Sequence, residues 1–214
     1  MRRLSEATAR TRRELRLALS LRALPPRVAR FFWRARRLAA RSGDDFSLLS
    51  PARPAELAEL LALARGRTAV VELGTGTAWS SIALALHDSK RRVISCDPIV
   101  RSQREAYLEL AGAVVRARIE LRAEPDDAGP RPGDPPVELL FVDSSHERKP
   151  TVAAFRAWRG ALAPGALVVF HDHANAEYPG VREAVEELEL AGETRASMFV
   201  WHAPSAGSLP MSDE

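Results

Sequence analysis

The chain has 214 residues, of which 46% are hydrophobic and 28% charged, with a formal net charge of only +3. This composition predicts one globular α/β domain rather than two. Cys96 is the only cysteine, so no disulfide can form within the chain, and its apolar surroundings favour a buried structural thiol in a reducing cytoplasm. No apolar run approaches the roughly twenty residues that a membrane-spanning helix needs, and the N-terminus lacks the features of a secretory signal peptide.

The N-terminal segment is the most basic part of the chain. Within residues 1–41 the only acidic residues are Glu6 and Glu14, whereas the rest of the chain is slightly acidic. After Pro25 and Pro26, apolar residues recur at helical spacing and arginines take the other faces, which predicts a basic amphipathic helix. The apolar positions are Leu24, Val28, Phe31, Phe32, Ala35 and Leu38, and the arginines are Arg27, Arg30, Arg34, Arg37 and Arg41.

Three interpretations of this basic arm remain open. The helix could pack its apolar stripe on the main domain as a cap or a dimer contact, or it could bind an anionic membrane surface or an acidic partner. Nucleic acid is not expected, because no base-reading module or aromatic-interleaved basic motif appears elsewhere. We therefore expect a helical arm or cap over residues 1–50, the main domain over 51–204 and a disordered tail over 205–214.

The main domain alternates short apolar runs with helical patterns. Such alternation predicts a Rossmann-like, doubly wound and mainly parallel seven-stranded sheet, whose ligands bind beyond the carboxyl ends of the strands. The expected strands are 69–73, 92–96, 117–121, 137–142, 166–170 and, at the edge, 198–202. The expected helices are 54–65, 79–86, 102–110, 151–162 and 181–190, and a loop rich in proline, glycine and aspartate over 124–136 could border a ligand pocket.

A glycine turn joins the first strand to the next helix. The stretch VELGTGTAW places Glu72, Gly74 and Gly76 at that turn, where the backbone can approach a ligand closely. A dinucleotide-binding fold would need a third glycine three positions after Gly76, where this chain has Trp79. The spacing instead resembles motif I of class I S-adenosylmethionine-dependent methyltransferases, although many α/β proteins turn on glycine without binding any ligand.

The second strand ends in Asp97, within the stretch ISCDP. A carboxylate at this position of a nucleotide-binding fold can accept hydrogen bonds from both ribose hydroxyls. The alternative is that Asp97 only opens an Asp-Pro turn.

Two later strand ends also carry polar residues. The stretch FVDSSH places Asp143 and His146 after one strand, and FHDH places His171, Asp172 and His173 after the next. Because neighbouring parallel strands lie only about 5 Å apart, their carboxylates can converge on one divalent cation. The alternative is that both aspartates cap the helices that follow and that the histidines face solvent.

Together, these stretches resemble the small-molecule O-methyltransferase group that includes the macrolide sugar O-methyltransferases. The resemblance covers residues 71–188 and rests on VELGTGTAW, ISCDP, FVDSSH, LAPGALVVFHDH and YPGVREAVEEL. It implies that Asp143 and Asp172 bind Mg²⁺ and that His146 is the general base. His171 stands where that group has an acidic residue, so Mn²⁺, Fe²⁺ or Zn²⁺ would be favoured relative to Mg²⁺, or His171 would not bind metal at all.

These observations lead to a functional hypothesis. We expect a cytoplasmic O-methyltransferase that transfers the methyl group of S-adenosylmethionine to a small hydroxylated metabolite, such as a sugar or a polyketide, with a divalent cation (Mg²⁺ or Mn²⁺) and a histidine base. The expected cofactor contacts are Glu72, Gly74, Thr75, Gly76, Ser80 and Asp97; the expected metal ligands are Asp143, His171 and Asp172. The alternatives are a metal-independent methyltransferase of the same fold and a non-catalytic binding protein attached to a membrane or partner by its arm. The sequence also leaves open whether the protein forms a homo-oligomer.

Overall fold

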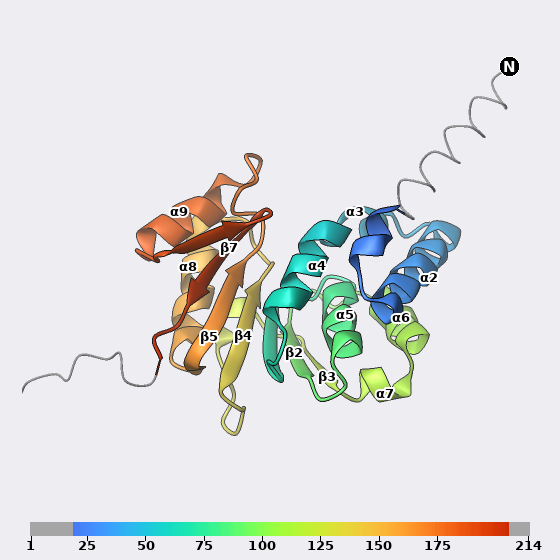
Figure 1. Ribbon diagram of the computed structural model, residues 1–214, viewed down its shortest axis with the longest axis horizontal. Helices are drawn as coiled ribbons and strands as arrows, with labels where there is room; N and C mark the ends of the chain where they lie inside the picture. Colours follow the sequence, from blue (N-terminus) through green and yellow to red (C-terminus); the bar gives the residue numbers. More distant parts are fainter. Residues whose placement is uncertain (1–18, 206–214) are drawn as a thin grey trace, which may run out of the picture.

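The computed structural model describes residues 19–205, which form one sheet with helices on both faces (Figure 1). Over these residues the sheet has seven strands in the order β3-β2-β1-β4-β5-β7-β6, as predicted for a Rossmann-like α/β fold. The strands are β1 (Ala69–Leu73), β2 (Arg92–Cys96), β3 (Ile119–Arg122), β4 (Val137–Val142), β5 (Leu162–Phe170), β6 (Gly192–Arg195) and β7 (Met198–His202).

The central strands run parallel and open one crevice. Strand β1 pairs in parallel with β2 on one side and with β4 on the other, and β4 continues in parallel to β5. The chain winds outward from β1 in both directions, so the carboxyl ends of β1 and β4 border the crevice in which doubly wound sheets bind ligands. Strand β7 runs antiparallel to both β5 and β6.

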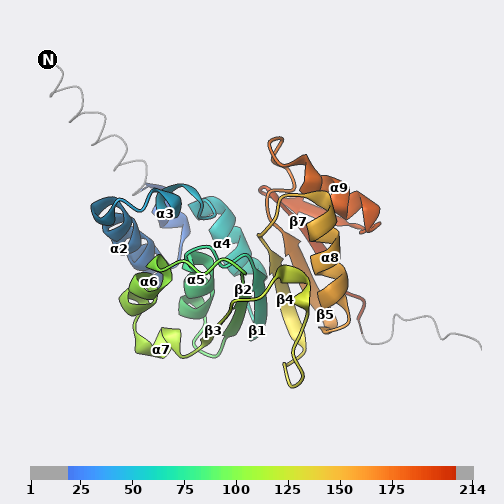
Figure 2. The same cartoon turned by 180° about the vertical axis from the view of Figure 1, so that it is seen from behind.

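Helices cover the two faces of the sheet in separate groups. Helices α2 and α4 to α6 gather over one face, and α8 and α9 over the other, as the two opposite views show (Figures 1 and 2). Neighbouring strand residues such as Val70 and Val71 belong to different apolar clusters, one on each face, as the strand period of two requires. The helices are η1 (Leu21–Ala23), α2 (Pro26–Ser42), α3 (Asp45–Leu49), α4 (Pro54–Leu63), α5 (Trp79–His87), α6 (Gln103–Ala111), α7 (Ala113–Arg116), η2 (Asp126–Ala128), α8 (Arg148–Arg159) and α9 (Pro179–Glu187).

The C-terminal edge of the sheet differs from the prediction. Strand β7 is not the edge strand, because β6 lies outside it. All four residues of β6 are exposed and none is strongly apolar, so no hydrophobic pattern marks this strand. Helix α8 ends at Arg159 rather than at residue 162, because Leu162 already pairs with Val137 in the sheet.

The amphipathic helix of the basic arm is part of the folded domain. Most of its apolar stripe, including Phe31 and Phe32, is buried, and both rings meet Trp79 edge to face at centroid distances of 6.1 and 5.3 Å. Helix α2 therefore packs its apolar stripe on the main domain. Residues 1–18 of the basic arm and 206–214 of the expected tail lie outside the described residues.

Two further predictions concern the membrane and the thiol. Over residues 19–205, none of the helices combines the length and the apolar character that crossing a bilayer requires. Cys96 is buried, and burial raises the pKa of its thiol to about 12. This thiol is therefore un-ionised at neutral pH, as expected for a structural cysteine.

Candidate active site at the carboxyl ends of the strands

A cavity of about 760 Å³ opens at the carboxyl ends of β1, β2, β4 and β5. Loops after these strands form its floor, the segment from Phe46 to Arg53 forms one wall, and residues 175–178 add to the lining. Nine of the ten site residues expected from the sequence line this one cavity: Gly74, Thr75, Gly76, Ser80, Asp97, Asp143, His146, His171 and Asp172. Glu72 is the exception.

The two glycines of the turn are needed for different structural reasons. Gly74 has a φ of +96°, and a Cβ atom added there would lie 2.1 Å from the carbonyl oxygen of Asp143. Gly76 has a φ of +52°, and a Cβ atom there would meet only the ring of Phe46, at 3.6 Å. Gly74 therefore allows the β1 turn to pack on the end of β4, and only Gly76 has open space beside it for a ligand.

Glu72 lies beneath the turn rather than in the cavity. Its side chain is fully buried, and one carboxyl oxygen accepts hydrogen bonds from Ser81 Oγ and, at 2.7 Å, from Ser95 Oγ. Thr75 joins the same group through a 2.8 Å hydrogen bond with Ser95. Glu72 therefore ties the strand, the turn and α5 together, and the expected direct contact with a ligand does not follow from its position.

A pH-dependent stability difference should reveal this burial. Burial raises the pKa of Glu72 from 4.5 to about 7. Between these values the folded protein binds more protons than the unfolded chain, so the free energy of unfolding falls as the pH rises. We expect Glu72→Gln, which is neutral at every pH, to match the wild type near pH 4.5 and to exceed its free energy of unfolding by about 3 kcal/mol near pH 8. Denaturant unfolding at both pH values measures the difference.

The exposed carboxyl of Glu183 provides the control for that measurement. Glu183→Gln should change the stability little, and equally, at both pH values. A Glu72→Gln difference that is the same at acidic and alkaline pH would contradict the assignment of a raised pKa.

Asp97 both borders the cavity and organises the turn beside it. Its Oδ2 accepts hydrogen bonds from Gly76 N at 3.0 Å and from the Arg104 guanidinium at 2.5 Å, and its Oδ1 accepts one from Ile99 N at 2.7 Å. The bond to Ile99 is the Asp-Pro turn that was one of the two interpretations. Because Asp97 also lines the cavity, both of its expected roles fit the structure.

Arg104 is a site residue that the sequence did not reveal. It is buried near the start of α6, and its guanidinium joins Asp97 to the carbonyl oxygens of Gly76 (2.7 Å) and Ile99 (2.6 Å). Its only sequence signal is a position seven residues after Asp97, in the first turn of a helix.

The loop after β3 adds another acidic side chain to the cavity. Asp126 lines the cavity, and its Oδ1 is buried without a hydrogen-bond partner. Burial raises the pKa of this carboxyl. Ser144, which follows β4, also lines the cavity, and its hydroxyl lies beside the Asp126 carboxyl. The loop over 124–136 therefore contributes Asp126 to the lining of the cavity.

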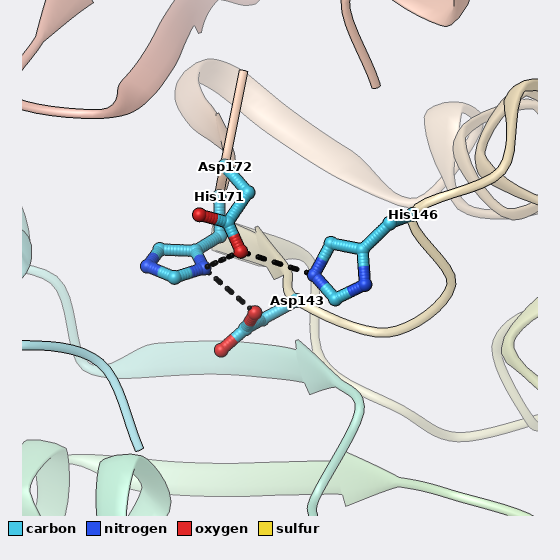
Figure 3. A group of neighbouring side chains, drawn as sticks. All are labelled: Asp143, His146, His171 and Asp172. Carbon is cyan, nitrogen blue, oxygen red and sulfur yellow. Dashed lines mark ion pairs between the residues drawn. The ribbon is translucent and has the colours of Figure 1, made fainter. Parts of the chain in front are cut away.

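Four side chains from two strand ends converge at one end of the cavity. His171 Nδ1 lies 2.9 Å from Asp143 Oδ1 and 3.2 Å from Asp172 Oδ2, and the same Asp172 oxygen lies 3.1 Å from His146 Nε2 (Figure 3). The four potential ligand atoms all lie within 4.8 Å of one another. Asp172 thus stands between the two histidines.

Glu56 on α4 adds a third carboxylate to this cluster. His171 Nε2 lies 3.4 Å from Glu56 Oε2, so the buried imidazole has three carboxylates around it. Burial alone would lower the pKa of His171, but Asp143, Asp172 and Glu56 raise it to about 12. Burial would likewise raise the pKa of Asp172, yet the two histidines hold it well below its ordinary value.

The loop that carries His146 is held by the start of α9. The ring of Tyr178 stacks on the His146 ring, with a centroid distance of 3.9 Å and an angle of 21° between the planes. A Cβ atom at Gly180 would lie 2.5 Å from the His146 carbonyl oxygen, so the two segments are in close backbone contact. Tyr178 and Gly180 therefore limit the orientations open to His146.

The alternative roles do not hold for Asp143, Asp172 and His171, whereas the His146 side chain is 32% exposed. Helix α8 begins after Glu147 and α9 after Tyr178, with no side-chain cap at either, so Asp143 and Asp172 cap neither helix. His171 is only 7% exposed. His173 packs its ring near Phe199 and does not line the cavity.

The donor set fits a divalent cation. His146 Nε2 and His171 Nδ1 are buried and form no properly directed hydrogen bond, although carboxylate oxygens lie near both. Ligand atoms about 2.1 Å from an octahedral cation lie about 3.0 Å from one another, close to the 2.9–3.2 Å spacings found here. A carboxylate on the outer nitrogen of a metal-binding histidine is also common, and Glu56 takes that position at His171.

Comparison with known proteins agrees with this fold and site. Residues 71–173, from the first strand to the histidine pair, match a family model described as a methyltransferase domain. The fold, the glycine turn and this match agree with the fold of class I S-adenosylmethionine-dependent methyltransferases. No curated protein sequence matches the chain significantly.

Several solved structures are similar to this chain over most of its length. The chain is similar to an O-methyltransferase from Bacillus cereus solved with S-adenosylhomocysteine (TM-score 0.64, 16% identity, 81% of this chain and 90% of that one). It is also similar to the calicheamicin-pathway enzyme CalS11, a TDP-rhamnose 3'-O-methyltransferase (0.58, 18%, 85% and 97%). A third similar structure is TomG of Streptomyces achromogenes, an O-methyltransferase of tomaymycin synthesis solved with S-adenosylmethionine (0.57, 21%, 85% and 91%). These likenesses show a shared fold.

Proposed function

We propose that the protein is an O-methyltransferase that uses S-adenosylmethionine and acts on a small hydroxylated metabolite, such as a sugar or a polyketide-like compound. The observation that carries the proposal is a single cavity lined by the glycine turn, Asp97 and the cluster of Asp143, His146, His171 and Asp172. One end of that cavity suits a nucleoside, and the other suits the activation of a hydroxyl group. The similar structures include O-methyltransferases, one of which acts on a sugar.

The cofactor would lie along the turn between β1 and α5. Asp97 Oδ1 keeps acceptor capacity for a ribose hydroxyl, and the side-chain oxygens of Asp126 and Ser144 can bind polar groups of the base. Gly76 and Ser80 border the cavity at the start of α5, where backbone N–H groups and the helix dipole favour a carboxylate. S-adenosylmethionine, when bound, supplies a methyl group on a positively charged sulfur.

His146 is positioned to remove the proton of the acceptor. During transfer a bond would form between the acceptor oxygen and the methyl carbon, the bond from that carbon to sulfur would break, and the hydroxyl proton would pass to the His146 imidazole, whose Nε2 faces Asp172. Asp172 Oδ2, at 3.1 Å, stabilises the resulting imidazolium. The stack of Tyr178 on His146 keeps the ring in place while it changes charge.

Asp143, His171 and Asp172 would hold a divalent cation such as Mg²⁺ or Mn²⁺. When bound, such a cation lowers the pKa of a hydroxyl group that it coordinates. A metal-independent reaction is the second candidate, and one observation favours it: a protonated His171 within 3.4 Å of three carboxylates offsets part of their negative charge without a cation. Location of the protein in the cytoplasm and its assembly into a homo-oligomer remain predictions.

Cofactor binding is the first test. We expect calorimetric titration with S-adenosylmethionine to show one site per chain, and Asp97→Asn to weaken binding about tenfold, since a hydrogen bond to a charged group contributes about 1.5–3 kcal/mol. The control is Asp127→Asn, because Asp127 is exposed and lies outside the cavity lining. The absence of any heat with the wild type would contradict the whole cofactor assignment and leave a non-catalytic binding protein.

Metal binding is a separate test. We expect Mn²⁺ titration followed by electron paramagnetic resonance to show one bound ion per chain, and Asp143→Asn with Asp172→Asn to abolish it, because two of its carboxylate ligands are lost. Full methyl transfer after removal of all divalent metal with a chelator would instead establish the metal-independent reaction.

A further inference from the structure

A row of arginines runs along the outer face of α2. Five arginines, which we call the arginine face, follow each other at spacings of three and four residues, so they share one flank of the helix: Arg27, Arg30, Arg34, Arg37 and Arg41. All five are exposed, and α2 contains no acidic residue. Within residues 19–205 none of them forms an ion pair with a carboxylate.

A shallow groove adjoins this arginine face. Its volume is about 340 Å³, and it lies between α2 and α6, where Leu38 and Leu110 meet three of the arginines. Trp33 also borders the groove, with 47% of its surface exposed, and the Arg37 guanidinium lies 4.6 Å from the centre of its ring. The surface thus combines several positive charges with a partly exposed indole and an apolar floor.

This combination fits one kind of partner best. Anionic phospholipid headgroups attract clustered arginines, and tryptophan favours the boundary between headgroups and acyl chains. We propose that the arginine face and Trp33 dock the protein on membranes that contain anionic phospholipids. Figure 1 shows α2 at the periphery of the molecule, on the side away from α9.

The mode of docking follows from the packing of α2. Its apolar stripe is buried against Trp79 and so cannot insert into a bilayer, which distinguishes α2 from a free amphipathic helix. Docking is therefore electrostatic, reversible and sensitive to salt.

Vesicle sedimentation with the full chain tests the proposal. We expect binding to vesicles of phosphatidylcholine with phosphatidylserine, little binding to phosphatidylcholine alone, and loss of binding at high salt. Because each arginine near an anionic surface contributes about fivefold, Arg30→Gln, Arg34→Gln and Arg37→Gln together should lower the partition coefficient roughly 100-fold. Trp33→Ala should lower it severalfold.

A matched control distinguishes the effect of where the arginines lie from the effect of the net charge of the protein. Arg65→Gln, Arg92→Gln and Arg159→Gln remove the same charge from exposed sites away from α2, and this triple variant should keep most of the binding. Unchanged melting temperatures and cofactor titrations verify that both triple variants are folded. Equal loss in the two triple variants, equal binding to neutral vesicles, or tighter binding to an RNA oligonucleotide at the same salt would each overturn the proposal.

Discussion

Alanine in place of His146 is expected to lower kcat for methyl transfer by about 10²–10⁴-fold, the usual contribution of a positioned general base. The affinity for S-adenosylmethionine should stay within a factor of two or three of the wild type, because the nucleoside contacts proposed for Asp97 and Asp126 lie elsewhere in the cavity. Formation of S-adenosylhomocysteine with a panel of phenols and deoxysugars identifies an acceptor for the assay, and calorimetry measures the affinity.

His202→Ala provides the matched control for this result. His202 is exposed at the end of β7 and does not line the cavity, so its loss should leave both kcat and the cofactor affinity unchanged. Turnover by His146→Ala at the wild-type rate would remove His146 from the reaction. Loss of cofactor affinity in the same variant would show instead that His146 shapes the cavity rather than accepts a proton.

The converging side chains could be predicted because the sheet geometry is simple. Asp143 follows β4, and His171 and Asp172 stand at the end of β5, and these two strands are parallel neighbours. Residues at the carboxyl ends of such strands meet at one edge whatever their separation in sequence. The apolar sequences of these strands located their ends to within a residue or two. The convergence of the polar residues at those ends could therefore be predicted.

Other parts of the site had no comparable signal. Glu56 lies 115 positions before His171, on a helix whose sequence indicates only a buried face, and their contact depends on how α4 packs. Tyr178 lies in the stretch YPGVREAVEEL, but its stack on His146 depends on the path of the loop after β5. Packing between elements distant in sequence decides both contacts, and local pattern does not encode it.

The sheet edge illustrates the same limit. The apolar run of β7 indicated a strand, but nothing in it indicated which strand lies outside it. Strand β6 lies at the edge of the sheet with all four residues exposed to solvent, so it buries no side chain and needs no apolar face.

Gly74→Ala is expected to lower the free energy of unfolding by at least about 3 kcal/mol, or the melting temperature by roughly 10 °C. The added methyl would lie only 2.1 Å from the Asp143 carbonyl oxygen, and the backbone at Gly74 would also keep a φ of +96° that side chains rarely adopt. Relief of this clash would displace Asp143, so the variant should also lose Mn²⁺ binding. Denaturant unfolding and Mn²⁺ titration measure the two effects.

Gly76→Ala separates backbone strain from the clash. Gly76 also has a positive φ, but a methyl group there meets only the Phe46 ring at 3.6 Å, so a cost of about 1–2 kcal/mol is expected. Its Mn²⁺ binding should remain, while its cofactor affinity should fall because the methyl group projects into the cavity. Equal destabilisation by the two substitutions would mean that strain alone accounts for both glycines. A larger cost at Gly74 would show that one glycine of the turn serves the junction of β1 with β4 and the other serves the ligand.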